Sequence, residues 1–325
     1  MSKAVKNWLI VAAVLIWVGI LIFCWVMSAN HWDFSALNTA EYEQRVVEIP
    51  HSFENISILS ETEDIALLPS PDGKCRVEFV ERKGETHTAE VQDGTLTIQA
   101  FRVGKWTDTL VVFSTESARI TLYLPEAEYT SLYIKESTGD IDLPAELFFE
   151  SVRIQANTGD VKSSASVSGL IRIDTDTGDI RLRELTAGEL TLSVSTGSVE
   201  IRGLVCAGDA EVTVSTGKAT LTDLTCANLR SKGSTGRITL ENVVAEDQIS
   251  IERSTGDVLF TLCDASELLI ETDTGSVTGS LLSEKVFIAH SDTGRVEVPE
   301  TVTGGKCKVT TDTGSIRLTV EGIGK

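Results

Sequence analysis

The sequence predicts an all-β protein: a parallel β-solenoid of about ten coils, preceded by a small β region and one N-terminal transmembrane helix. Three observations predict it. A Thr-Gly pair recurs ten times at a step of 19 or 20 residues, apolar residues keep fixed positions between the pairs, and the run Trp8–Met27 carries no charge. A repeat of this length is typical of a structural unit that is stacked many times.

The uncharged run, residues 8–27, is long enough to cross a bilayer, since a helix of this length spans about 30 Å. Lys3 and Lys6 precede it and acidic residues follow it. The positive-inside bias then places residues 1–7 in the cytoplasm and the rest outside. A cleaved signal peptide is the alternative, but its apolar core is usually shorter, about 7–15 residues. We expect an uncleaved, single-pass anchor in the cell membrane, followed by a polar tether at 28–45.

Residues 46–136 are interpreted as a small β region that caps the solenoid. Short alternating or apolar runs such as Val46–Ile49 and Ile120–Leu124 favour strands, and Asp93-Gly94 favours a tight turn. Such a region would cover the first coil, whose open edge otherwise invites pairing with other chains.

The Thr-Gly repeat fills residues 137–325. Glycine accepts a positive φ at a tight corner, and the Ser, Asn or Asp before each Thr hydrogen-bonds readily to nearby backbone. We therefore interpret the pairs as a structural turn motif at the corners of the coils. The pairs are Thr138 and Gly139, Thr158 and Gly159, Thr177 and Gly178, Thr196 and Gly197, Thr216 and Gly217, Thr235 and Gly236, Thr255 and Gly256, Thr274 and Gly275, Thr293 and Gly294, and Thr313 and Gly314.

Two alternating apolar runs lie between successive pairs. In the coil 177–195, Ile180 and Leu182 belong to the first run, and Leu190 and Leu192 belong to the second. The pattern predicts two strands and two corners in each coil, with aliphatic columns stacked inside. An antiparallel meander would show the same columns, but its loops would vary more in length than the observed step. The handedness of the solenoid stays open.

The composition excludes several classes of protein. A formal charge of −20 disfavours binding to nucleic acid. The six cysteines include no C-x-x-C, so they predict neither a zinc site nor a disulfide framework. Cys206 and Cys226 are one repeat apart, and whether they pair stays open.

We expect no metal, no cofactor and no catalytic residue. Asp140, Asp160 and Asp179 follow Gly in the first coils, but Lys218 and Arg237 interrupt this column, which makes a calcium ladder a poor prediction. A single weak calcium site near the three Asp residues stays open. The constant step leaves no room for the long loops that build a catalytic cleft, so the chain is not expected to be an enzyme.

The segments Ile120–Pro125, Leu132–Ile134 and Ser137–Ile141 resemble the bacterial DUF4097 family, as do Asn157–Val161 and Asp176–Ile180. The resemblance covers about residues 46–325. It implies a cell-envelope protein, because members are often labelled putative adhesins and some are tied to envelope-stress loci of Gram-positive bacteria. It implies no catalytic residues.

These observations predict an extracytoplasmic repeat protein that acts by binding, as an adhesin or envelope scaffold. The expected partner is a protein or a component of the cell wall or matrix. An accessory role in envelope-stress signalling is the first alternative, and a surface polysaccharide hydrolase is the least favoured one. The last coil, with Ile316, Leu318, Val320 and Ile323, has an open edge that predicts either self-association or a further cover.

Overall fold

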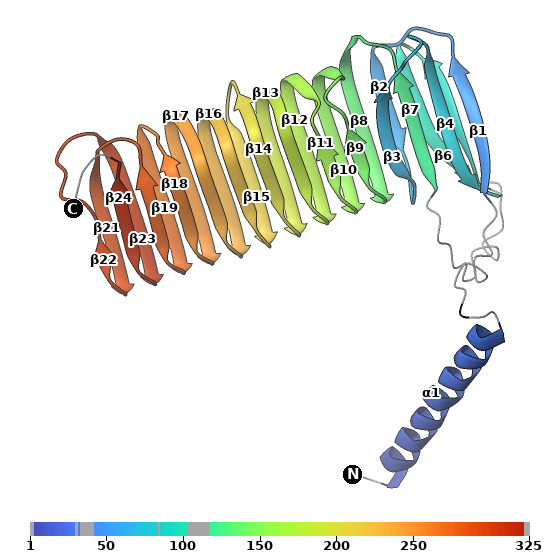
Figure 1. Ribbon diagram of the computed structural model, residues 1–325, viewed down its shortest axis with the longest axis horizontal. Helices are drawn as coiled ribbons and strands as arrows, with labels where there is room; N and C mark the ends of the chain where they lie inside the picture. Colours follow the sequence, from blue (N-terminus) through green and yellow to red (C-terminus); the bar gives the residue numbers. More distant parts are fainter. Residues whose placement is uncertain (1–2, 30–31, 33–41, 84, 103–117, 322–325) are drawn as a thin grey trace.

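The computed structural model describes residues 3–29, 32, 42–83, 85–102 and 118–321 (Figure 1). It contains one helix, α1 (Lys3–Ala29), and a long stack of β-strands. The predicted fold class, an all-β solenoid with an N-terminal apolar helix, is confirmed.

Helix α1 is apolar throughout most of its length. Its segment Val5–Ala29 is long and apolar enough to cross a membrane. A signal sequence near the N-terminus can meet the same criteria of length and composition, so α1 suits either role.

The solenoid is built from parallel strands that pair one coil apart. Ile173 pairs with Leu192, and Leu192 pairs with Val212, so each strand lies beside its counterpart in the next coil. This pairing rules out the antiparallel meander. The strands are β8 (Glu128–Thr138), β9 (Ile141–Leu143), β10 (Phe148–Thr158), β11 (Val161–Ser163), β12 (Ser166–Thr177), β13 (Ile180–Thr196), β14 (Val199–Cys206), β15 (Ala210–Thr216), β16 (Ala219–Thr235), β17 (Ile238–Thr255), β18 (Val258–Cys263), β19 (Glu267–Thr274), β20 (Val277–Leu281), β21 (Lys285–Thr293), β22 (Val296–Glu297), β23 (Gly305–Thr313) and β24 (Ile316–Val320).

The parallel stack begins before the first Thr-Gly pair. β2 pairs in parallel with β6 and β8, and β3 pairs in parallel with β7 and β9. β1, β4 and β5 pair antiparallel at this end of the stack. The bounds of these strands are β1 (Tyr42–Ile49), β2 (Asn55–Leu59), β3 (Asp64–Pro69), β4 (Cys75–Arg82), β5 (Glu85–Gln92), β6 (Thr95–Arg102) and β7 (Arg119–Leu124).

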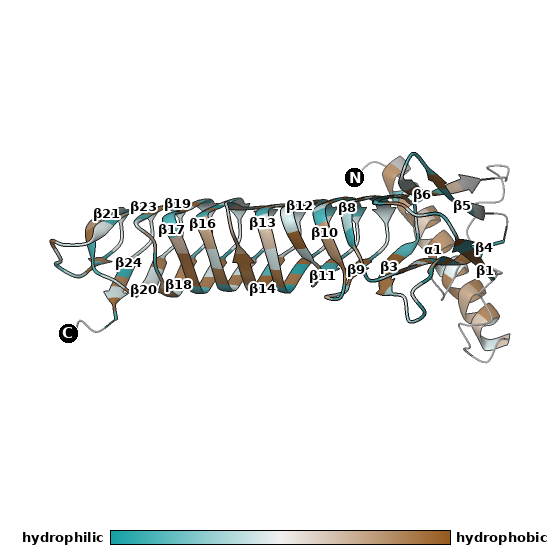
Figure 2. Ribbon diagram, turned by 90° about the horizontal axis from the view of Figure 1, so that it is seen from above, coloured by the Kyte–Doolittle hydropathy of each residue, from teal (hydrophilic) through white to brown (hydrophobic). Residues whose placement is uncertain are grey.

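The core is a set of stacked aliphatic columns inside the rod. Ile180, Leu182 and Leu192 are fully buried, and their counterparts in neighbouring coils are buried as well. Figure 2 shows the rod from above, with hydrophobic and hydrophilic residues alternating along the rungs. Stacking supplies the cover that a single coil lacks, because side chains on one face of each strand point toward the interior.

The central coils contain a corner that the repeat pattern did not reveal. Seven residues after the Thr, the backbone takes a left-handed conformation, with φ between 50° and 69°. The residues are Glu184, Gly203, Asp223, Asn242 and Leu262. The expected two corners per coil therefore become three in these coils. The residue type changes from coil to coil, so no motif marks this corner.

The order of the coils in space differs from their order in the chain at both ends. The coil β23–β24 lies between β19–β20 and β21–β22. At the other end, β2–β3 lies between β6–β7 and β8–β9. Ile316, Leu318 and Val320 are therefore buried, and the end rung is residues 285–297 instead of the last coil. The open edge expected on the last coil belongs to β21 and β22.

Candidate functional site

The ten Thr-Gly pairs lie in one column along a single corner of the rod. Each Thr is paired in register with a Thr of the neighbouring rung, and all ten Thr side chains are exposed. At this corner Gly197 N–H donates to the carbonyl oxygen of Thr216, with an N···O distance of 3.0 Å. The predicted turn residues are thus brought together as a continuous surface column.

The close stacking of neighbouring rungs explains why glycine occupies this corner better than the positive φ alone does. Gly197 has a φ of 144°, and a Cβ at this position would lie 2.0 Å from the carbonyl oxygen of Gly178 in the adjoining rung. Such a contact is far shorter than the 3.4–4 Å of ordinary van der Waals contact. A side chain would therefore push the rungs apart.

The aspartates that follow the glycines are used within the corner. Asp140 Oδ1 accepts the backbone N–H of Asp160 at 2.8 Å, and Asp160 Oδ1 accepts that of Asp179 at 2.9 Å. Arg181 forms ion pairs with Asp160 at 2.6 Å and with Asp179 at 2.5 Å. These carboxylates accept backbone hydrogen bonds from the neighbouring rung, and two of them form ion pairs with Arg181. These contacts explain the Asp in the motif without a calcium ion. Among the described residues, no group of three His, Cys, Asp or Glu side chains is arranged to hold a metal ion.

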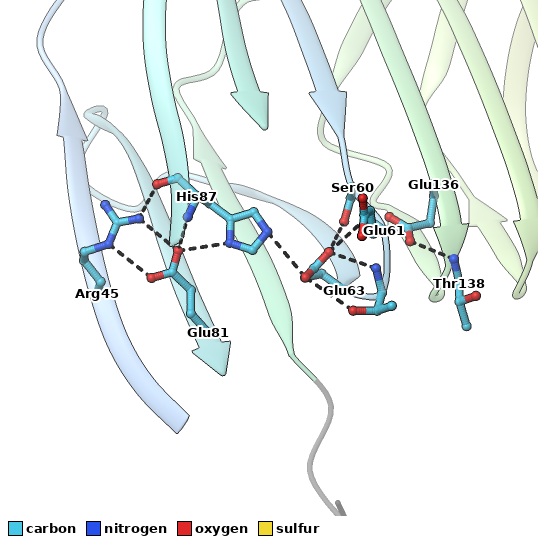
Figure 3. A network of polar contacts seen from close by, with 9 residues as sticks. Arg45, Ser60, Glu61, Glu63, Glu81, His87, Glu136 and Thr138 are labelled. Carbon is cyan, nitrogen blue, oxygen red and sulfur yellow. Dashed lines mark hydrogen bonds and ion pairs between the residues drawn. The ribbon is translucent and has the colours of Figure 1, made fainter. Parts of the chain in front are cut away.

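A buried charged cluster lies at the N-terminal end of the Thr-Gly column (Figure 3). We call it the His87 cluster; its members are Arg45 on β1, Glu63 in the turn before β3, Glu81 on β4, His87 on β5 and Glu136 on β8. The exposed fractions of Glu63, His87 and Glu136 are 2%, 2% and 1%. The sequence did not predict this cluster.

His87 lies between two carboxylates. Its Nδ1 is 3.0 Å from Glu81 Oε1, and its Nε2 is 3.4 Å from Glu63 Oε1. Arg45 Nη2 approaches the same oxygen of Glu81 at 2.9 Å. The antiparallel strands β1, β4 and β5 are thereby connected through side chains to the turn between β2 and β3.

Glu63 occupies the corner where this rung has no Thr-Gly pair. Its Oε2 accepts the hydroxyl of Ser60 at 2.5 Å and the backbone N–H groups of Glu61 and Thr62 at 3.1 and 3.0 Å. The carbonyl oxygen of Glu61 accepts the N–H of Thr138 at 2.9 Å. The Glu63 carboxylate therefore organises the turn on which the first Thr-Gly corner stacks.

Burial and charge shift the pKa values of this cluster in opposite directions. Burial raises the pKa of Glu63, but contacts with His87 and Ser60 outweigh it and lower the pKa to about 2. Burial lowers the pKa of His87, but Glu63 and Glu81 together raise it more, so that it lies above its usual value. Burial raises the pKa of Glu136 to about 7, although its Oε1 accepts the N–H of Thr138 at 2.9 Å. The cluster can therefore take up or release a proton near neutral pH.

The geometry of the His87 cluster does not suit catalysis on a bound substrate. The exposed fractions of Glu63, Glu81 and His87 are 2%, 6% and 2%, so a substrate would have to displace the surrounding chain to reach them. A buried ion pair with several hydrogen bonds is more often a feature that specifies how elements dock.

The cysteine side chains are all free thiols in this structure. Cys206 and Cys226 lie in neighbouring coils and are buried. Burial raises the pKa of the Cys226 thiol to about 12, which keeps it protonated and unreactive.

The sequence profile of the family described as Toastrack DUF4097 matches residues 53–214. The chain belongs to the Toastrack DUF4097 family. No curated protein matches it. The family profile spans the antiparallel strands β4 and β5, the His87 cluster except Arg45, and the first Thr-Gly coils.

Several solved structures are similar to this member of the family. A putative adhesin from Parabacteroides distasonis has a TM-score of 0.51 at 14% identity, over 86% of this chain and 98% of that chain. A putative adhesin from Bacteroides fragilis has a TM-score of 0.42 at 15% identity, over 86% and 97%. A protein from Parabacteroides distasonis described as a putative lipid binding protein has a TM-score of 0.44 at 13% identity, over 85% and 96%. The first of these likenesses shows the fold.

Proposed function

We propose that this protein is a membrane-anchored rod outside the cytoplasm that acts by binding, as an adhesin or scaffold of the cell envelope. Residues 8–27 would span the membrane, residues 1–7 would lie in the cytoplasm, and residues 28–45 would tether the rod. The apolar helix α1 supports the anchor. The family and the description of the similar structures as adhesins support a binding role.

The observation that carries this proposal is the uninterrupted Thr-Gly corner. Ten exposed threonines stand in register on successive rungs, so each rung repeats the same hydroxyl at a spacing of about 4.8 Å. Such a surface can contact an extended partner at many points. Each contact is weak, but the contacts together can make binding to that partner specific. With a formal charge of −20, the rod favours a neutral or basic partner.

The test uses the full-length protein in lipid nanodiscs and measures its retention on isolated cell-wall polymer and on extracellular matrix protein. A double variant, Thr177→Ala with Thr196→Ala, removes two hydroxyls from the corner. The matched control, Thr186→Ala with Thr225→Ala, changes two exposed threonines on a different column, in the coils that begin at Thr177 and Thr216. We expect the first variant to bind less and the control to bind as the wild type does.

Two outcomes would contradict the proposal. One is failure of the wild-type protein to bind any wall or matrix component. The other is a reporter fused after residue 325 that is found in the cytoplasm. Cross-linking of the protein to a membrane sensor in cells would instead favour the accessory role in envelope-stress signalling.

A further inference from the structure

A buried arginine stands inside the rod in the middle of the stack. Arg253, on β17, has an exposed fraction of 3% and points into the interior. The corresponding position, two residues before the Thr, holds Val194 and Val214 in earlier coils and Thr272 in the next. A charged side chain here is a departure from the aliphatic pattern of the core.

Among the residues that the structure describes, the guanidinium of Arg253 has one hydrogen-bond partner. Its Nη2 donates to Ser231 Oγ at 2.8 Å. Its Nε is buried without any partner, and no ion pair within the described part of the chain includes Arg253. Burial lowers the pKa of Arg253 only to about 10, so the group keeps its charge at neutral pH. A buried charge of this kind calls for a counter-charge.

Gly233 provides the space that the guanidinium occupies. It is the register partner of Arg253 on the neighbouring rung, and a Cβ there would lie 1.6 Å from Arg253 Nη1. Val194 and Val214 pair in the ladder one rung earlier, but Val214 and Gly233 do not. The carbonyl oxygen of Val214 also lies close by, 2.4 Å from the same Cβ position.

A pocket of about 260 Å³ is lined by both Gly233 and Arg253. Its rim carries hydroxyl groups, including those of Ser234 and Ser254, and the ammonium of Lys232. Lys232 is already paired with Glu252 at 2.9 Å, so Arg253 is the cation of this pocket that has no ion pair among the described residues.

We propose that this pocket binds a small anion with one negative charge, a carboxylate, which pairs with the guanidinium of Arg253 through Nη1. The planar, forked guanidinium suits a carboxylate, and the rim hydroxyls can donate further hydrogen bonds. Glu252, Glu271 and Asp273 also line the rim, so their charge disfavours anions with two or more charges. This site is independent of the adhesive role proposed above.

The experiment uses the full-length protein in detergent micelles with ¹³C-formate as the probe, at constant ionic strength. We expect saturable broadening of the formate resonance and a rise in the thermal unfolding midpoint. At formate ten times above Kd, the unfolding equilibrium constant should fall about 11-fold. Arg253→Met should abolish both effects. Arg230→Met, which removes an exposed arginine on β16, is the control and should retain both.

The result that would overturn the proposal is a lack of saturable formate binding to the wild-type protein. Equal binding to the Arg253→Met variant would overturn it as well, as would tighter binding of sulfate than of formate. If Arg253→Met fails to fold, the wild-type and Arg230→Met titrations still decide whether a saturable site exists. In that case Arg253→Lys, which keeps the charge but loses the fork, should bind formate several-fold more weakly.

Discussion

Replacing Gly197 by Ala tests whether close stacking of the rungs requires glycine at the Thr-Gly corner. The new Cβ would lie 2.0 Å from the Gly178 carbonyl oxygen, about 1.4 Å inside ordinary contact. The rungs must separate locally to relieve this overlap. That movement would disrupt two hydrogen bonds, Gly178 N–H to Thr196 and Gly197 N–H to Thr216, both 3.0 Å long.

The expected cost follows from these two contributions. Each lost backbone hydrogen bond destabilises by about 1 kcal/mol. Holding Ala at a φ of 144° adds about 1–2 kcal/mol, because this backbone region strongly favours glycine. We therefore expect Gly197→Ala to lower the free energy of unfolding by about 3–4 kcal/mol.

Gly73→Ala is the matched control. Gly73 also has a positive φ, 71°, but a Cβ there would meet nothing within 4 Å. Only backbone strain remains, and the expected loss is about 1 kcal/mol. Both variants are compared with the wild type by denaturant unfolding of the full-length protein in micelles, followed by far-UV circular dichroism. If Gly197→Ala loses no more stability than Gly73→Ala, close stacking is not the reason for the glycine.

Three further predictions concern the His87 cluster and the core. Since the pKa of Glu136 is raised to about 7, its protonated form favours the folded state, and the free energy of unfolding of the wild type should fall by up to about 3 kcal/mol as pH rises from about 4.5 to about 7. Glu136→Gln should remove this fall in pH-dependent unfolding experiments, and a pH profile identical to that of the wild type would contradict the prediction. Because the pKa of His87 is raised, its contribution to the stability of the folded state is complete below pH 6.5 and is lost as pH rises through the folded-state pKa. His87→Gln should therefore destabilise the protein by about 3–5 kcal/mol at acidic pH and by less at alkaline pH. Equal shifts of the thermal unfolding midpoint at the two pH values would refute this. Leu192→Ala, which empties a fully buried position between two rungs, should cost about 2–5 kcal/mol in denaturant unfolding, whereas exposed Val205→Ala on β14 should cost less than 1 kcal/mol.

The repeat and its interior were predictable because their determinants are local. Strand alternation at Ile180 and Leu182 fixes which side chains face inward, and the constant step makes the next coil present the same columns. The apolar helix α1 was equally visible, since length and composition alone define a segment that can enter a membrane.

The left-handed corner of the central coils was not predictable from the sequence, apart from Gly203. The other residues with a positive φ at this corner are Glu184, Asp223, Asn242 and Leu262. Stacked neighbours hold the backbone in this conformation, and the residue types do not form a pattern that predicts it. The order of the end coils was hidden for a similar reason. The strands of every coil have nearly the same residue pattern at their hydrogen-bonding edges. The sequence therefore does not predict which coils pair with each other.

Only the tertiary structure decided the buried charges. Glu63, Glu81, His87 and Glu136 come from four different elements, and they meet because antiparallel strands at one end pack against the first parallel rungs. Arg253 and Gly233 become neighbours only when two coils are set in register. The sequence by itself determined the repeating unit and its inward face, because these depend on residues a few positions apart. Stacking order and buried ion pairs depend on contacts between distant residues, and so they were decided when the coils packed together.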